Sequence, residues 1–195
     1  MKLVYTPRSH FSRKVRILLA CLGHEIPLVD AGNVADRDPA RFGDNPLMSV
    51  PVLVDDDGSL VFDSDHIAQQ LVHRLDPQDR YDVLTRDVAT LNGRAVMNGI
   101  MAAEVDVVLA KRTGMDVDRY ARFAKRTQVI AQGLDWLEAR ADALFGERPS
   151  YAGFHLVAMW DHLRLYGLLD GDRPRLRERA AALSADPIVA ASAPS

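Results

Sequence analysis

Residues 2–15 have the sequence KLVYTPRSHFSRKV, in which the chain changes from a strand-like pattern to a helical one. The run Lys2–Tyr5 is typical of a short strand, whereas from Phe11 onward apolar residues recur at helical spacing until Gly23. The loop 6–9 between them contains a proline and ends in a serine, a residue type that often caps helices. This stretch therefore predicts a strand that leads through a tight loop into a helix.

The same alternation of short strands and helices continues to about Pro77 and predicts a small α/β domain. A second strand is expected at Glu25–Val29, where the proline favours an edge position. Two further apolar runs flank the acidic turn 55–58, which predicts a β-hairpin, and Ile67–Leu75 again has helical spacing. The predicted order is β-α-β, a polar connection, and then β-β-α.

The sequence beyond Asp76 predicts helices only, after a polar linker that contains a proline. Ser150 is expected to cap one of these helices, and the small-residue tail after Leu183 is expected to fray. The expected domains are an α/β domain at residues 1–76, a linker at 77–82 and an all-helical domain at 83–195.

The composition predicts a globular protein of the cytoplasm. A net charge of -3 over 195 residues predicts neither a nucleic-acid partner nor attachment to an anionic membrane. No apolar run approaches the roughly 20 residues that a membrane span needs. The single cysteine, Cys21, excludes an internal disulfide and a cysteine-based metal cluster and suits a reducing compartment, and no metal is expected.

The charges of the first half are distributed unevenly. Its acidic residues outnumber its basic ones, yet Arg8, Arg13, Lys14 and Arg16 gather at the start of the first predicted helix. A helix N-terminus with nearby cations attracts anions. The pattern therefore predicts an anion-binding site at this helix start.

Three segments of the first half, in this order and spacing, resemble the glutathione transferase superfamily, above all bacterial members with a serine in the first loop. They are the loop and helix start at 6–14, the approach to the third strand at 45–53, and the strand-to-helix junction at 62–67. The resemblance extends more weakly over the helical half. It implies a thioredoxin-like, glutathione-binding α/β domain followed by an all-α domain.

The resemblance implies a catalytic role for Ser9, whose hydroxyl would hydrogen-bond the sulfur of glutathione and favour its thiolate. Thioredoxin-like relatives carry a Cys-x-x-Cys pair where this chain has Ser9 and Ser12, so disulfide exchange from this loop is excluded. A helix dipole, nearby cations and a hydroxyl donor all lower a thiol pKa. The simpler alternative is that either serine only caps the helix, and Ser12 is expected to act mainly as a cap.

The same resemblance assigns the remaining glutathione-binding residues. Val50 precedes Pro51 in an expected cis peptide bond, and the backbone of Val50 would pair with the cysteinyl residue of glutathione like an added strand. Ser64 would bind the γ-glutamyl carboxylate at a helix N-terminus, and Asp63 would face the α-amino group. Both residues could instead serve only as helix caps, and the two roles are compatible.

Some positions depart from the family pattern. Many relatives carry Gly-Lys where this chain has Met48 and Ser49, so another cation would have to hold the glycyl carboxylate, and Arg37, Arg41 and Arg8 are the candidates. His10 replaces a proline, and its role stays open.

The resemblance also implies a second-substrate pocket and a symmetric homodimer. The pocket residues would be Phe11 in the first loop and three residues of the first long helix after the linker: Met97, Asn98 and Met101. Flexible methionines suit a permissive apolar wall, although an ordinary core stripe explains them equally well.

The expected activity is that of a glutathione transferase of detoxification type, which uses glutathione as co-substrate and attacks a small hydrophobic electrophile. A glutathione-dependent isomerase or dehalogenase would use the same site with a different electrophile. A non-catalytic interaction or regulatory module with a relic site is the alternative from another class.

Overall fold

The computed structural model describes residues 1–194, and the chain divides into two compact units. Unit 1 comprises Met1–Leu84 together with the described residues from Asp186 onward, and unit 2 comprises Thr85–Ala185. Among the described residues, no helix is long and apolar enough to cross a membrane.

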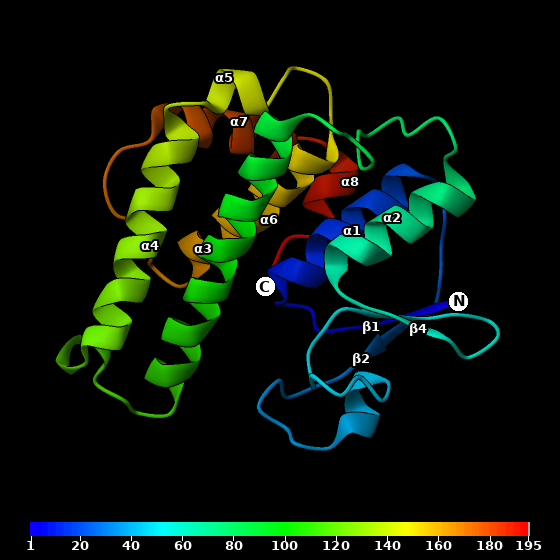
Figure 1. The fold of residues 1–195 in the computed structure, drawn as a ribbon, viewed down its shortest axis with the longest axis horizontal. Coiled ribbons are helices and arrows are strands. Elements are labelled where there is room, and N and C mark those ends of the chain that lie inside the picture. Colours follow the sequence, from blue (N-terminus) through cyan, green and yellow to red (C-terminus); the bar gives the residue numbers. More distant parts are fainter. Residues whose placement is uncertain (195) are drawn as a thin grey trace. The chain divides into compact units, whose positions relative to one another are not determined.

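Unit 1 is an α/β unit in which α1 and α2 lie together on one side of a small sheet (Figure 1). Its elements up to residue 84 are β1 (Lys2–Tyr5), α1 (His10–Cys21), β2 (Leu28–Asp30), the 3₁₀ turn η1 (Pro39–Phe42), β3 (Val52–Val54), β4 (Leu60–Val61) and α2 (Ser64–Leu75).

Within the described residues, the strands form one four-stranded sheet in the order β2-β1-β3-β4. Strand β1 is parallel to β2 and antiparallel to β3, which is in turn antiparallel to β4. The end of β1, the start of β3 and the end of β4 therefore lie at the same edge of the sheet. The three segments that resemble the glutathione transferases all meet the sheet at this edge.

The two faces of the sheet are both covered, because successive residues of a strand point to opposite sides. Leu3 and Leu53 are paired across β1 and β3 and pack with residues of α1 and α2. Val4 and Val52 form the next pair and pack against Phe42 of η1, which is fully buried. A β-carbon at Gly43 would lie 3.2 Å from Val4, and the residue has a positive φ of 64°. Glycine at this position therefore lets the η1 segment approach the sheet closely.

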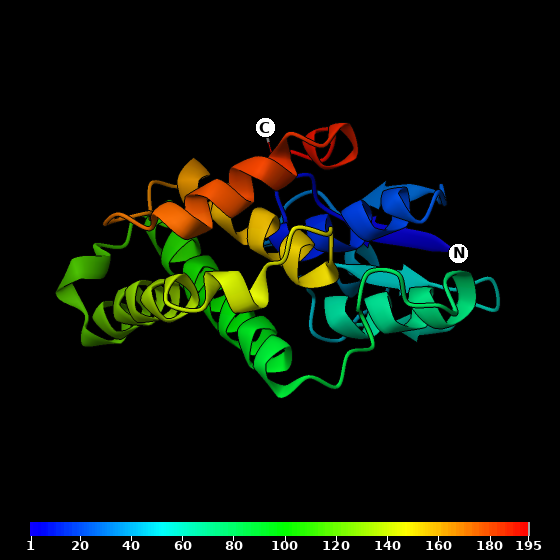
Figure 2. The same ribbon diagram turned by 90° about the horizontal axis from the view of Figure 1, so that it is seen from above.

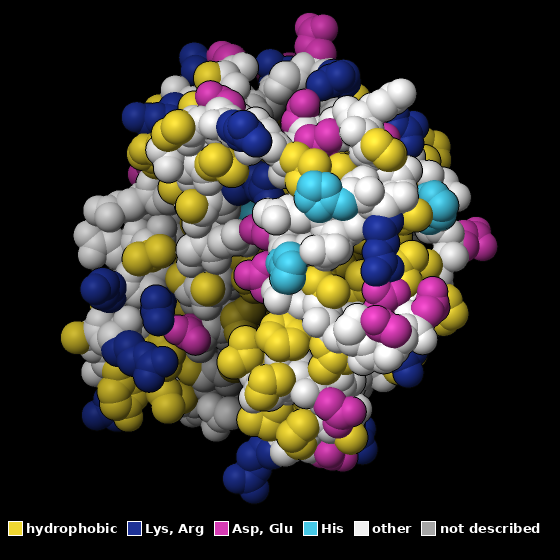
Figure 3. All heavy atoms as spheres, turned by 45° about the vertical axis from the view of Figure 1, so that its right-hand side comes forward, with side chains coloured by type: hydrophobic (Ala, Val, Ile, Leu, Met, Phe, Trp, Pro, Cys, Tyr) yellow, Lys and Arg dark blue, Asp and Glu magenta, His cyan; other side chains and the backbone are white. Residues whose placement is uncertain are grey.

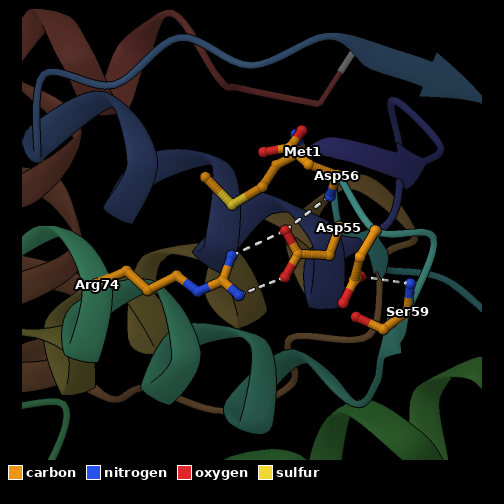
Figure 4. Close-up of polar contacts among 6 residues, drawn as sticks. Met1, Asp55, Asp56, Ser59 and Arg74 are labelled. Carbon is orange, nitrogen blue, oxygen red and sulfur yellow. Dashed lines mark hydrogen bonds and ion pairs between the residues drawn. The ribbon is translucent and has the colours of Figure 1, made fainter.

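The β3–β4 hairpin is tied to α2 and to the chain's N-terminus (Figure 4). The Arg74 guanidinium of α2 binds both carboxylate oxygens of Asp55, with one Nη1–Oδ1 distance of 2.8 Å. The terminal amino group of Met1 pairs with Asp56. The Arg74 guanidinium beside Asp55 holds the pKa of that carboxyl at about 2, below its ordinary 3.8.

The tail of the chain is ordered and belongs to unit 1, which contradicts the expectation that it frays. Residues Pro187–Ala190 form the short helix α8, which lies beside α1 in both ribbon views (Figures 1 and 2). Val189 is buried and Asp186 caps the helix by accepting a hydrogen bond from the Ile188 N–H at 2.8 Å. The small side chains of this tail let it pack closely, and they do not leave it loose.

Unit 2 is entirely helical within the described residues. It contains α3 (Val88–Arg112), the 3₁₀ turn η2 (Val117–Arg119), α4 (Ala121–Glu138), α5 (Ala141–Leu144), α6 (Tyr151–Leu165) and α7 (Pro174–Ser184). Helix α4 packs against α3, and α6 packs against α3 and α7. The predicted α/β and all-α halves of the fold are thus confirmed.

The expected cap of α6 is confirmed, and the residue that bonds to it, Gly153, lies close to α7. The Ser150 hydroxyl accepts a hydrogen bond from the Gly153 N–H at 3.2 Å. A β-carbon on Gly153 would lie 3.0 Å from Leu183 of α7. The glycine at this place therefore makes room for α7.

Candidate functional site

Ser9 is the N-cap of α1. Its backbone is extended and its hydroxyl oxygen accepts a hydrogen bond from the Ser12 N–H at 3.1 Å. The loop before it closes with a hydrogen bond from the Ser9 N–H to the Thr6 carbonyl at 3.1 Å. Because the oxygen of Ser9 accepts from the helix, its hydrogen is directed away from that bond and can be donated to a ligand.

The expectation that Ser12 mainly caps the helix is wrong. Ser12 lies inside the first turn of α1 and is fully buried, while the cap is made by Ser9. Its Oγ has no hydrogen-bond partner among the described residues.

Helices α1 and α2 are joined near their N-terminal ends by a largely buried ion pair. Lys14 Nζ lies 2.9 Å from Asp65 Oδ1, and the lysine side chain has no exposed surface. This pair keeps the two helix starts together at the edge of the sheet where β1 and β4 end. Two helix N-termini that lie together favour a ligand with negative charge.

Asp63 and Ser64 form the start of α2. Asp63 is its N-cap, and one carboxylate oxygen accepts hydrogen bonds from the Asp65 N–H at 2.9 Å and the His66 N–H at 3.2 Å. The capping alternative is therefore confirmed for Asp63, whose second carboxylate oxygen makes no hydrogen bond with other described residues. Ser64 is the first residue of the helix and is buried.

The segment before β3 is shaped by a buried asparagine. The Val50–Pro51 peptide bond is cis, as the family resemblance implied. Asn45 is buried, its amide donates to the Ser49 carbonyl at 2.9 Å, and its own oxygen accepts from the Leu47 N–H at 3.0 Å. Asn45 thus fixes the conformation of the loop that leads through Val50 into β3.

The predicted cluster of cations at the start of α1 is mostly engaged within the protein, so the predicted positive spot is smaller than expected. Arg13 and Lys14 are buried, Lys14 pairs with Asp65, and the Arg16 guanidinium lies 5.1 Å from the Tyr5 ring centre. Arg8 is the exposed member of the four.

The candidates for the glycyl carboxylate differ in their partners. Arg41 Nε lies 3.0 Å from Asp36. Arg37 is exposed and forms no ion pair within residues 1–194.

The proposed second-substrate residues are placed separately in the two units. In unit 1, Phe11 is half-buried and its ring centre lies 4.7 Å from that of the buried His10. In unit 2, Met97 and Met101 are fully buried on α3, and Asn98 is half-buried. Their role in binding a substrate stays a prediction.

Two buried side-chain contacts in unit 2 were not predicted from the sequence. His155 Nε2 lies 3.1 Å from the Met101 sulfur, so that methionine has a polar neighbour in the core. His162 Nδ1 lies 2.6 Å from Glu104 Oε1, where both residues are buried. Burial raises the pKa of Glu104, and the contact with His162 opposes that rise. The sequence offered no signal for either pair, because the partners are more than 50 positions apart.

Unit 1 exposes several large apolar side chains. Figure 3 shows them at the height where Figure 1 draws β2 and η1. The large exposed apolar residues of this part of the chain are Leu28, Val29, Val34, Leu47 and Met48. Exposed apolar surface suits ligands that are not wholly polar.

Known proteins resemble this chain in sequence and in structure. Residues 8–74 match the family of glutathione S-transferase N-terminal domains. Maleylacetoacetate isomerase of Pseudomonas aeruginosa is 29% identical over an alignment that covers 96% of this chain and 92% of that protein.

Two solved structures are similar over nearly their whole length. A glutathione S-transferase from Methylobacillus flagellatus with bound glutathione has a TM-score of 0.84 and 27% identity, covering 100% of this chain and 99% of that one. A glutathione S-transferase from Methylobacterium radiotolerans in complex with glutathione sulfonate has a TM-score of 0.81 and 26% identity, with 99% and 94% covered.

Proposed function

Because the chain belongs to the glutathione transferase superfamily, we propose that it binds glutathione at the edge of the unit 1 sheet and stabilises the thiolate there. The chain is an enzyme of this superfamily. In the proposed reaction, the glutathione thiolate attacks a small apolar electrophile. The observation that carries the proposal is the position of Ser9, a hydroxyl at the N-cap of α1.

The geometry of Ser9 supports a donor role. Its oxygen accepts from the Ser12 N–H, which leaves the hydroxyl hydrogen for the sulfur of the ligand. A hydrogen bond to a thiolate favours the charged form, and the dipole of α1 acts in the same direction. Capping and catalysis are therefore compatible in one side chain.

Other groups at the same edge match the remaining parts of glutathione. The N-terminus of α2 at Ser64 suits the γ-glutamyl carboxylate, and the unengaged oxygen of Asp63 suits the α-amino group. The backbone of Val50, which makes no hydrogen bond with other described residues, suits the cysteinyl residue.

Substitution is the first candidate reaction. The sulfur of glutathione forms a bond to an electrophilic carbon while the bond to a leaving group, such as a halide, breaks and the leaving group takes the electron pair. The protein supplies thiolate stabilisation and proximity. The glutathione is consumed in this reaction.

Cis–trans isomerisation is the second candidate, favoured by the similarity to maleylacetoacetate isomerase over almost the whole chain. The thiolate would add to one carbon of a double bond conjugated to a carbonyl, the resulting single bond would rotate, and the thiolate would leave again. Glutathione is regenerated, so its consumption separates the two reactions.

We also propose that the protein is cytoplasmic and forms a homodimer. Light scattering, which gives the molar mass in solution, tests the dimer.

Calorimetric titration with glutathione near neutral pH tests the site. We expect saturable binding by the wild type and its loss in the double variant Asp63→Ala, Ser64→Ala. Asp87→Ala is the matched control, because it removes the N-cap of α3 in unit 2, and the proposed glutathione-binding residues all belong to unit 1. A wild type that fails to bind millimolar glutathione would overturn the proposal in favour of a non-catalytic module.

Ser9→Ala, assayed with a reactive aryl halide, tests activation of the thiolate. We expect kcat to fall about 10²- to 10³-fold, as for the loss of one donor to a developing negative charge. A second assay uses a compound with a cis double bond conjugated to a carbonyl, together with glutathione. Transfer consumes the glutathione, whereas isomerisation gives the trans compound and regenerates it.

A further inference from the structure

Ser12 has a buried hydroxyl without a hydrogen-bond partner. Its side chain is fully buried in the first turn of α1, and its Oγ bonds to no other described residue. Buried hydroxyls normally have partners, because an unpaired one loses the hydrogen bonds that water gave it. The described residues therefore leave the hydroxyl of Ser12 available to a partner from outside the chain.

Three hydroxyls in helices or just beyond their ends make local hydrogen bonds. Thr113, Thr127 and Ser192 each donate to a backbone carbonyl three or four residues earlier. This back-bonding is the usual solution for serine and threonine in a helix. Ser12 does not make such a bond.

The position of Ser12 in the helix directs its side chain toward the turn that contains Ser9. Side chains of a helix lean toward its N-terminus and cover the preceding turn. For Ser12 this turn contains Ser9, whose Oγ lies 3.1 Å from the Ser12 backbone nitrogen. Ser9 and Ser12 also have the spacing of a Cys-x-x-Cys pair, in which the two sulfurs approach to about 2 Å. Side chains at these two positions can therefore contact the same atom.

We propose that Ser12 is a second hydroxyl donor to the thiolate sulfur of bound glutathione, beside Ser9. The inference rests on the proposed function and adds a catalytic residue to it. No covalent bond forms at Ser12, which keeps its proton and shares it with the sulfur in a hydrogen bond. Two donors stabilise the thiolate more than one does, so both serines lower the pKa of the bound thiol.

The test is the pKa of the glutathione thiol in the complex, followed by the ultraviolet absorbance of the thiolate in a pH titration. We expect Ser12→Ala to raise this pKa by about one unit, which is 1.36 kcal/mol of differential interaction. Near neutral pH, kcat/KM should fall up to about tenfold while the calorimetric affinity for S-methylglutathione is unchanged. The unfolding midpoint of the free protein should not fall, because the hydroxyl has no partner to lose.

Ser12→Cys under a non-thiol reductant is the second variant, since it keeps the shape of the side chain and a weaker donor. It should raise the thiol pKa by less than Ser12→Ala does, and it serves alone if the alanine variant does not fold. Ser9→Ala is the positive control.

The outcomes separate this inference from the proposed function. A thiol pKa that rises in Ser9→Ala and stays unchanged in both Ser12 variants overturns the role of Ser12 only. A lower unfolding midpoint of Ser12→Ala with an unchanged thiol pKa assigns Ser12 to the fold, and it also overturns the inference. Absence of glutathione binding by the wild type overturns the proposed function itself.

Discussion

Arg13 and Ser192 are 179 positions apart, and the Arg13 Nε donates a hydrogen bond to the Ser192 Oγ at 3.1 Å where both residues are buried. Ser192 in turn donates to the Val189 carbonyl at 2.7 Å. The Arg13 N–H bonds the Ser9 carbonyl at 2.9 Å. The tail of the chain is thus connected through one arginine to the residue that carries the proposed chemistry.

Ser192→Ala should lower the free energy of unfolding by about 1–2 kcal/mol, because it removes a hydrogen bond to a buried charged group. Urea unfolding measures the change. Ser184→Ala is the control, a serine near the end of α7 whose side chain makes no hydrogen bond within residues 1–194. Equal effects of the two substitutions would show that the contact with Arg13 contributes nothing.

Asp55→Asn should flatten the acid dependence of stability. The pKa of Asp55 is about 2 in the folded protein and 3.8 when unperturbed, so its contribution is present above pH 3.8 and is lost as the pH falls through about 2. The wild type should therefore lose stability more steeply than Asp55→Asn over this range in acid titrations of unfolding.

Asp44→Asn, at an exposed aspartate that forms no ion pair with other described residues, should keep the wild-type slope. High salt should reduce the difference between wild type and Asp55→Asn, since the Arg74 side chain is half exposed to solvent. An identical slope for wild type and Asp55→Asn would contradict the role of the Arg74 pair.

Gly133→Ala and Gly99→Ala should change stability in opposite directions. A β-carbon at Gly133 of α4 would lie 2.7 Å from Ile100 of α3, so overpacking should outweigh the better helix propensity of alanine and cost about 1 kcal/mol net. Gly99 meets nothing within 4 Å, and alanine there should add about 0.5–1 kcal/mol. Thermal unfolding of both variants checks the pair, and stabilisation by Gly133→Ala would show that Ile100 moves aside freely.

Cys21 should react slowly with iodoacetamide in the folded protein. Burial raises the pKa of its thiol to about 11, the carboxylate of Asp186 adds to the rise, and Tyr81 opposes it. Against the ordinary value of 9.0, the thiolate fraction at neutral pH falls about a hundredfold. The rate should increase with pH until about 11, and the urea-unfolded chain should react at the ordinary rate.

Asp186→Asn should speed the alkylation of Cys21 while it preserves the cap of α8, because asparagine caps a helix as well as aspartate does. An unchanged rate would remove Asp186 from the causes of the shift.

The parts of the fold that the sequence predicted depend on local patterns. The strand–loop–helix at residues 2–15, the acidic hairpin turn and the helical spacing of the second half are each contained in a short window of sequence. The cis bond before Pro51 was predicted from a family motif, and the structure has it. The observed strand β2 begins at Leu28, three residues later than expected, since β-ladder pairing with β1 sets its start.

The errors concern contacts between distant segments. Four cations close together in sequence predicted a positive surface, yet Lys14 and Arg13 turn inward to Asp65 and Ser192, which lie 51 and 179 positions away. The same contact with Ser192 explains why the tail is ordered. Which of two serines caps α1 was also open, because the choice depends on the residue at which the helix begins.

The cap at Ser9 has a consequence for the evolution of related chains. A serine whose oxygen holds the first turn of a helix is favoured for stability alone, so a descendant that had lost its reaction would still tend to keep it. The hydroxyl of Ser12 gives the fold no bond, and drift to alanine would go unopposed once glutathione was no longer used. Position 12, rather than position 9, is then the one that distinguishes working descendants from silent ones.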